Sequence, residues 1–478
     1  MEASYRIVSL IVACALFMEM VDATALATAL PSIAEDLAVS PLTLSLAITA
    51  YVLSLALFIP VSGWLADRIG AKRVFGTAIL VFLAGSIASG LADSLWQLVA
   101  ARALQGSGGA LMTPVARLIL LRSVPRARLV DAMAWMGIPA LIGPIMGPPL
   151  GGFLVDVASW RWIFWINVPI GLIGVFAVWR FVPDIPKREH RPFDLTGFLA
   201  IGAGFLSLMA GLELVDGQLV DTRLAFVSMA AGIVLLLWYL RHARRGANPV
   251  IDVTLIGHRT FRASLLGGIF FRLGGGALPF LMPLLLQELY GYSASSAGLL
   301  LCSAALGAIA MKFMAGRVIS TFGFRRVLLV NSLACALFIG LLGLPDPQGP
   351  GLWVLAALLL IGGSCRSLQF TSINTIAYAE VEESRMGDAT AFASVVGQVA
   401  MAIGVAGSAL LLTAFSGDGA LPDSGGFALA FAAIAGIMLL AVLPFWVLPP
   451  AAGSEISRHR ARSQSLDRSD AGRLKGQA

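Results

Sequence analysis

Long apolar stretches, separated by short polar segments, repeat along the whole 478-residue chain. A helix that crosses a bilayer needs about 20 mainly apolar residues. A window of that length predicts fourteen spans, near 7–30, 42–64, 74–92, 95–121, 132–155, 162–182, 195–214, 223–241, 262–287, 295–315, 327–345, 351–377, 388–414 and 425–448. The pattern therefore predicts an all-α membrane protein, and the even number of spans places both chain ends on one side.

Composition supports a membrane protein independently of the windows. The chain is 58% hydrophobic and only 13% charged, with a mean hydropathy of +0.86. A soluble protein of this size needs more charged surface than that. The composition excludes the ordinary soluble classes.

The charges between the spans predict which side of the membrane each loop faces. Most Lys and Arg residues fall in the loops near 68–73, 122–128, 180–191, 241–262 and 325–326, whereas the opposite loops carry Arg161 and Arg223 among acidic residues. Loops rich in Lys and Arg stay in the cytoplasm. We therefore expect a cytoplasmic (inner) membrane protein with both termini in the cytoplasm. The net charge of +6 is then a topology signal and not evidence for nucleic-acid binding.

The chain contains a weak internal repeat. "GWLADRIGAKR" at Gly63–Arg73 returns as "GRVISTFGFRR" at Gly316–Arg326. Duplicated helical bundles around a central site are typical of transporters. We expect an N-terminal six-helix bundle over 1–185, an inserted two-helix hairpin over 186–250, a C-terminal six-helix bundle over 251–450 and a disordered cytoplasmic tail over 451–478.

Several motifs of enzymes and metalloproteins are missing from the sequence. It has no GxxxxGK[ST] phosphate-binding loop, which argues against ATP as the energy source. The four cysteines, Cys14, Cys302, Cys335 and Cys365, are isolated in apolar runs, so we expect neither disulfides nor a metal site. We expect no enzymatic activity and no cofactor.

Two carboxylates interrupt the first apolar segment, "CALFMEMVDATALATALP". A charge in mid-membrane costs about 2.5–3.5 kcal/mol on insertion scales, so Glu19 and Asp22 need an explanation. Residues three apart share a helix face, and a carboxyl in apolar surroundings takes up a proton more readily than one in water. The pair could therefore couple proton flow to transport or bind cargo. The alternatives are a structural hydrogen-bond acceptor for Asp22, and a polar neighbour or an arginine partner for Glu19.

Arginines occur inside three other predicted spans. Arg102 could hold a nearby carboxylate ionised until a proton or cargo competes, or it could form a fixed salt bridge in the N-terminal bundle. Arg272 aligns with Glu19 in the repeat to within a residue, so we expect both to face one cavity. Together with Arg366 it could bind carboxylate or phosphate groups. The alternative is that these two arginines form buried ion pairs.

Two polar residues follow Arg366 on the same predicted helix. These residues, Gln369 and Asn374, are candidates for binding cargo beside the arginines.

Five segments resemble motifs of the major facilitator superfamily. They are "GWLADRIGAKR", "RALQGSGGA" at 102–110, "GPIMGPPLGGFL" at 143–154, "FMEMVDATALATALP" at 17–31 and "WRWIFWINVPIG" at 160–171. Their order and spread resemble the fourteen-helix drug:proton antiporter family (EmrB/QacA-like). Within it, "FFRLGGGALPFLMPLLLQ" at 270–287 and "CRSLQFTSINT" at 365–375 are most similar to the MdtD-type multidrug exporters.

The resemblance implies roles for named residues. It assigns Asp22 and Arg102 to proton coupling. It implies a latch at the cytoplasmic gate (Gly63, Asp67, Arg68, Gly70 and Arg73) and an antiporter motif that seals against proton leak (Gly143, Pro144, Gly147, Pro148, Gly151 and Gly152). The second copy of the loop motif has Ser320 where the first has Asp67, so we expect the latch to be one-sided.

Three functional interpretations follow from these residues and the resemblance. The first is a multidrug:proton antiporter that works by alternating access, as a monomer, with small molecules and protons as its partners. The second is an exporter of anionic metabolites, such as carboxylates or their metal chelates, which Arg272 and Arg366 favour. The third is a membrane sensor that transports nothing, and the intact set of motifs argues against it.

Overall fold

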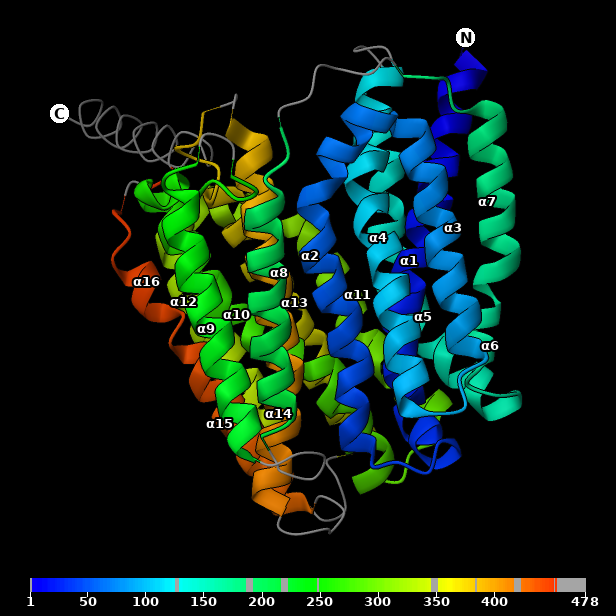
Figure 1. Ribbon diagram of the computed structural model, residues 1–478. Coiled ribbons are helices and arrows are strands. Elements are labelled where there is room, and N and C mark those ends of the chain that lie inside the picture. Colours follow the sequence, from blue (N-terminus) through cyan, green and yellow to red (C-terminus); the bar gives the residue numbers. More distant parts are fainter. Residues whose placement is uncertain are drawn as a thin grey trace, which may run out of the picture.

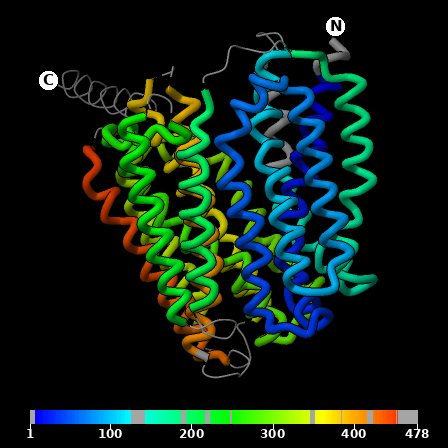
Figure 2. Tube along the Cα trace, in the orientation of Figure 1, coloured from blue at the N-terminus to red at the C-terminus, as the bar shows by residue number. Residues whose placement is uncertain are grey.

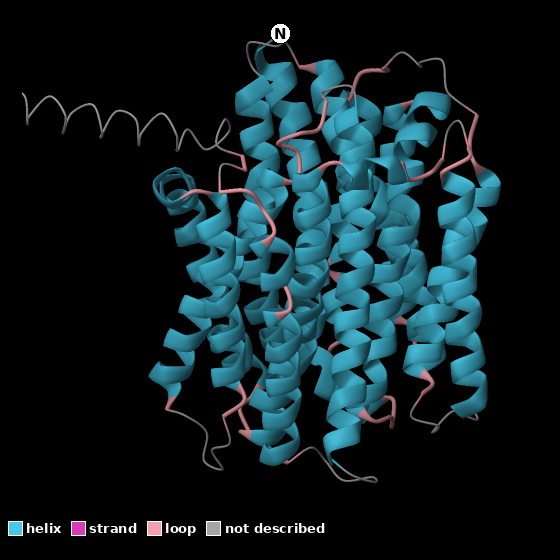
Figure 3. Ribbon diagram, turned by 90° about the vertical axis from the view of Figure 1, so that its left-hand side faces the viewer, coloured by secondary structure: helices cyan, strands magenta, loops and turns pink. Residues whose placement is uncertain are grey.

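The computed structural model describes residues 2–124, 129–185, 192–215, 222–246, 249–344, 351–382, 385–416, 423–450 and 452–453. Within these ranges every regular element is a helix (Figure 3). The side chains of 129–141 and the expected tail beyond 453 lie outside the described part of the chain.

The helices fall into two groups joined by a helical pair. The N-terminal half comprises α1 (Glu2–Asp36), α2 (Ser45–Ile69), α3 (Ala71–Gly90), α4 (Leu95–Ser123), α5 (Leu129–Val157), α6 (Trp162–Trp165) and α7 (Asn167–Phe181). The joining pair is α8 (Leu195–Glu213) and α9 (Thr222–Ala243). The C-terminal half comprises α10 (Arg259–Leu284), α11 (Ala294–Phe322), α12 (Phe324–Leu342), α13 (Leu352–Ile376), α14 (Met386–Ser416), α15 (Ser424–Leu439) and α16 (Val442–Trp446). Short turns η1 (Pro41–Leu44), η3 (Val253–Gly257) and η4 (Leu285–Leu289) connect or extend them.

Helices occupy each of the ranges that the hydrophobic pattern predicts. Among the described residues, 12 stretches are both long and apolar enough to cross a membrane. Helix α4 is not one of them, and α5 contributes the shorter apolar stretch Ile142–Val157. The all-helical membrane architecture is therefore confirmed.

Small residues let the helices of each half approach closely. A methyl group on Gly85 of α3 would overlap the backbone of Gln105 on α4, and one on Gly108 would overlap the backbone of Phe82. Close approach of this kind is how helices associate where the hydrophobic effect no longer drives them together. It fixes α4, and with it Arg102, against α3.

The loop repeat appears in the structure as two equivalent turns. Gly70 joins α2 to α3 with φ 107°, and Gly323 joins α11 to α12 with φ 76°. L-residues rarely adopt this backbone conformation, whereas glycine does so without a steric penalty. The second glycine of each repeat copy is therefore required by the turn.

The two halves meet at the end of the bundle away from the N-terminus of α1 (Figures 1 and 2), and α2 also packs against α14. The backbone N–H of Ser295 donates to Asp156 at 2.9 Å, and the Gln287 amide donates to the Thr28 carbonyl at 3.0 Å. A methyl group on Gly298 would overlap the Pro148 carbonyl. Helices α5 and α11 thus close this end of the interface between the halves.

Candidate functional site

The carboxylate of Asp22 accepts three hydrogen bonds inside the protein. Its Oδ2 accepts a hydrogen bond from Arg102 at 2.6 Å. Its Oδ1 accepts from the amides of Gln105 and Asn167, each at 2.9 Å. Asp22 and Arg102 are each only 1% exposed. Helices α1, α4 and α7 therefore meet at one buried ion pair.

Arg102 links this ion pair to the space between the halves. Its Nη1 also donates to the Gln105 side-chain oxygen at 2.6 Å, and its guanidinium lies 4.2 Å from the ring centroid of Tyr51. Its Nε is buried and has no hydrogen-bond partner among the described residues. Arg102 contacts Asp22 on one side and lines a cavity on the other.

Asn167 and Gln105 are functional candidates that the sequence did not single out. Asn167 also donates to Ser86 at 3.0 Å, and both side chains are almost fully buried. Each lies in a segment that carries the family resemblance, "WRWIFWINVPIG" and "RALQGSGGA". An amide in such an apolar span is the signal that could have identified them.

Glu19 has a different environment from Asp22 although both lie on α1. It is 4% exposed, and its Oε2 accepts one hydrogen bond, from Thr113 at 3.2 Å. It lines the cavity between the halves, whereas Asp22 is not among the described residues that do so. The spacing of the two residues led us to expect one shared helix face. In the structure Glu19 lines the cavity, whereas Asp22 contacts Arg102.

A cavity of about 440 Å³ lies between the halves and is called the central cavity below. Its walls come from α1, α2, α4 and α5 on one side and from α10, α11, α13 and α14 on the other. Apolar side chains supply most of the lining, and the polar ones are Glu19, Thr24, Tyr51, Arg102, Arg366 and Gln398. A largely apolar cavity with a few polar groups is a typical small-molecule site.

Arg366 enters the central cavity from α13 without a partner. No described residue forms a hydrogen bond or an ion pair with its guanidinium. The ion pair considered as the alternative from sequence is therefore absent for Arg366 within the described residues.

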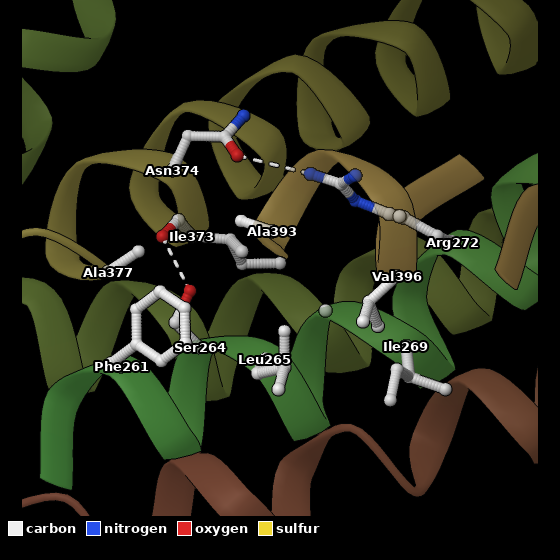
Figure 4. Close-up of a pocket in the computed structure, with 12 residues that line it drawn as sticks. Phe261, Ser264, Leu265, Ile269, Arg272, Ile373, Asn374, Ala377, Ala393 and Val396 are labelled. Atoms are coloured by element: carbon white, nitrogen blue, oxygen red, sulfur yellow. Dashed lines mark hydrogen bonds between the residues drawn. The ribbon is translucent and has the colours of Figure 1, made fainter. Parts of the chain in front are cut away.

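Arg272 does not share the cavity of Glu19, contrary to expectation. It lines a separate small cleft of about 20 Å³, where its Nη2 donates to Asn374 at 3.1 Å (Figure 4). Its guanidinium lies 5.2 Å from the ring centroid of Phe370. A methyl group on Gly397 of α14 would overlap this guanidinium. The side chain is thus held between α13 and α14, one turn along α10 from the residues that line the central cavity.

Gln369 does not line the central cavity either. It is fully buried among α12 residues, donates to Ser332 at 2.8 Å and accepts from Asn331 at 3.0 Å. All its contacts lie inside the C-terminal half. The expectation that Gln369 binds cargo is therefore not supported, because its helix turns it away from the central cavity.

The predicted gate residues lie around the turn between α2 and α3. Asp67 forms an ion pair with Arg122 of α4 at 2.8 Å, and Arg68 lies 5.0 Å from the ring centroid of Trp64. Arg73 is exposed on α3. Asp67 therefore pairs with a side chain of its own half.

The glycines of the antiporter motif on α5 face two different helices. Methyl groups on Gly143, Gly147 and Gly151 would overlap Met20, Thr24 and Ala25 of α1, respectively, and one on Gly152 would overlap Ala294 of α11. Thr28 also donates to the carbonyl of Pro148 at 3.3 Å. Helix α5 therefore packs tightly against α1 of its own half and against α11 of the opposite half. Pro144 lies within this run.

This packing predicts that Gly151→Ala destabilises the protein and Gly63→Ala does not. The added methyl at 151 meets the Ala25 backbone, which cannot move aside, and such overpacking costs about 1–3 kcal/mol. The methyl at 63 has nothing within 4 Å. Thermal unfolding of the two purified variants in detergent checks this. Equal unfolding midpoints would contradict the assigned α1–α5 contact.

Comparison with known proteins identifies the fold. A sequence profile described as Major Facilitator Superfamily matches residues 12–258 and 264–473. The chain belongs to the major facilitator superfamily. It is 38% identical over 470 residues to the "Putative multidrug resistance protein MdtD" of Klebsiella pneumoniae (strain 342), covering 97% of this chain and 99% of that one. The resemblance read from the sequence motifs is therefore confirmed.

Solved transporters of this superfamily share the architecture at low sequence identity. A POT family transporter in complex with 5-aminolevulinic acid superimposes with a TM-score of 0.71 at 14% identity, over 94% of this chain and 96% of that one. A D-xylose-proton symporter gives a TM-score of 0.69 at 14% identity, over 94% and 99%. These likenesses show the fold. The chain is thus a multi-pass membrane transporter of the major facilitator superfamily.

Proposed function

We propose that this transporter exports small molecules against an inward flow of protons. The observation that carries the proposal is the buried ion pair between Asp22 and Arg102, which lies directly beside the central cavity. All three contacts to Asp22 come from N–H donors. A proton on either oxygen neutralises the carboxylate, so proton uptake weakens its ion pair with Arg102.

Proton uptake at Asp22 would change the cavity wall through Arg102. Once the carboxylate is neutral, the permanently charged guanidinium loses its counter-ion and seeks another acceptor. Cargo in the central cavity, or Glu19, can then take that place. The protonation of Asp22 and the binding of cargo to Arg102 would then be linked. An antiporter that exchanges cargo for protons requires such a link.

The proposal includes the topology expected from the sequence. We propose that α4 and α5 also cross the bilayer, which gives fourteen spans, with α8 and α9 as a hairpin inserted between two six-helix bundles. With both termini in the cytoplasm of the inner membrane, the end closed by α5 and α11 is the outer one. The two halves rock about the central cavity to alternate access.

The energy source in this proposal is the proton gradient, with no cofactor and a single chain as the working unit. A membrane potential of about 100 mV supplies roughly 2.3 kcal/mol per charge moved. At about 1.4 kcal/mol per factor of ten, one net charge sustains a cargo gradient of about fifty-fold. This is sufficient for useful export without ATP.

Purified protein in liposomes that enclose a pH-sensitive dye tests the proposal. A proton gradient is imposed, and either a lipophilic cation (tetraphenylphosphonium) or a tricarboxylate (citrate) is added. We expect proton flux that starts only when a transported compound is present. Proton flux that no compound alters would contradict proton-coupled export and favour a sensor.

A second candidate cargo is supported by Arg366. Its unpaired guanidinium in the central cavity favours anionic compounds such as carboxylates or their metal chelates, because guanidinium binds them in a bidentate manner. In the same assay, flux elicited by citrate alone would support this alternative. Arg272, in its separate cleft, contributes less to it than the sequence suggested.

A further inference from the structure

The charged side chains within the predicted spans differ in whether another side chain pairs with them. Asp22 and Arg102 are paired with each other, and Arg272 has Asn374 as a partner in its own cleft. Among the described residues, Glu19 accepts one hydrogen bond, from Thr113, but has no ion-pair partner, and Arg366 has neither. They line the same cavity from opposite halves of the protein, and among the described residues they form no ion pair with each other.

Other polar groups of the central cavity also lack partners. The hydroxyl of Tyr51 is buried, with the residue 3% exposed, and has no hydrogen-bond partner among the described residues. Tyr51 lies beside Glu19, since a methyl group on Gly109 would lie 3.3 Å from the Tyr51 hydroxyl and 3.7 Å from Glu19 Oε1. Buried polar groups are almost always hydrogen-bonded. A bound ligand would give Glu19, Arg366 and Tyr51 the partners that they lack.

We propose that the cargo is zwitterionic: an apolar body that carries both an ammonium group and a carboxylate. This inference rests on the proposed function and narrows its substrate class. The ammonium binds Glu19 and Tyr51, and the carboxylate binds Arg366 from the other half. The apolar walls, among them Met20, Leu55 and Met282, receive the body of the molecule.

A cargo with a single charge fits this cavity less well. A cation satisfies Glu19 but brings a like charge near Arg366, which stays buried without a partner. An anion satisfies Arg366 but faces the carboxylate of Glu19. Leaving a buried charge unpaired is strongly unfavourable. A cargo with both charges removes both problems and bridges the two halves.

A matched set of fluorescent probes tests the proposal. Nα-dansyl-lysine carries an ammonium and a carboxylate on a flexible chain, its methyl ester carries only the ammonium, and its Nε-acetyl derivative carries only the carboxylate. Dansyl emission rises in an apolar site, so each probe can be titrated against purified protein in detergent. We expect the zwitterion to bind about tenfold tighter than either relative, which corresponds to one charged contact.

Variants assign the two contacts separately. Arg366→Met should weaken the zwitterion about tenfold and strengthen the methyl ester, because the like charge near its ammonium is removed. Arg366→Lys should restore part of the loss. Glu19→Gln should weaken the zwitterion and strengthen the Nε-acetyl probe, because the like charge facing its carboxylate is removed. Arg317→Met, at an exposed arginine of α11, is the matched control and should bind all three like the original protein.

The possible results also separate this inference from the proposed function. Equal binding of the three probes, no binding of any, or an unchanged zwitterion affinity in Arg366→Met would overturn the zwitterionic site. These titrations need no gradient. Zwitterion binding without probe-dependent proton flux in liposomes would refute proton coupling alone, and proton flux driven equally by all three probes would refute the zwitterion preference alone.

Discussion

Replacement of Asp22 by Asn is expected to reduce proton-driven cargo movement to the level of empty liposomes. Asn has nearly the same shape and can still contact Gln105 and Asn167, but it cannot take up or release a proton. Exchange of labelled for unlabelled cargo across the membrane needs no net proton movement, so it should continue. The measurement is cargo flux in liposomes with and without an imposed pH gradient, alongside cargo exchange without one.

The matched control for this change is Asp184→Asn. Asp184 is an acid with a 90% exposed side chain, at 3.9 Å from Lys72. The same chemical change there should leave proton-driven flux intact. Asp22→Asn protein that still accumulates cargo in response to the pH gradient would show that another group carries the proton. Glu19 would then be the next candidate, as the other acid on α1 beside the cavity.

Arg102→Met is expected to lower the free energy of unfolding by about 3–5 kcal/mol, the usual effect of removing one partner of a buried ion pair. It leaves the Asp22 carboxylate buried with only the two amides. The double variant Asp22→Asn with Arg102→Met removes both charges and should recover most of the loss. Denaturant or thermal unfolding in detergent measures both variants against the original protein. Arg117→Met, at an exposed arginine on the same helix, is the control.

The two arginine variants together separate structure from coupling. If Arg102→Met were as stable as the original protein, the ion pair would contribute little to folding. If the double variant were no more stable than Arg102→Met alone, the loss would come from packing against Tyr51 and not from an orphaned carboxylate. Either result would contradict the assignment of Asp22 and Arg102 as one charge-balanced unit.

The hydrophobic pattern was sufficient to predict where the helices lie. Apolar runs near the thickness of a bilayer leave the chain few options other than helices, and the two glycines at positions 70 and 323 indicated the paired turns. The same pattern could not predict the direction of individual side chains. Glu19 and Asp22 are about 60° apart around the helix axis, which is enough for one to face the cavity and the other to face α4 and α7.

The misplaced candidates share a physical cause. Repeat alignment placed Arg272 level with Glu19. In the structure its guanidinium packs against Gly397 of α14, where a larger residue would leave no room, and so it lies outside the central cavity. Gln369 lies three residues from Arg366, yet Asn331 and Ser332 on α12 bind it from the other side. Both outcomes depend on neighbours distant in sequence. Arg366, for which no described residue supplies a hydrogen bond or an ion pair, lines the central cavity.

The most direct test of proton coupling is to let a cargo gradient move protons. Liposomes are loaded with a transported compound and a pH-sensitive dye, with equal pH on both sides, and diluted into buffer without the compound. We expect the lumen to become more acidic as cargo leaves, and Asp22→Asn liposomes to show no pH change. Cargo efflux with a constant internal pH in the original protein would contradict proton-coupled export.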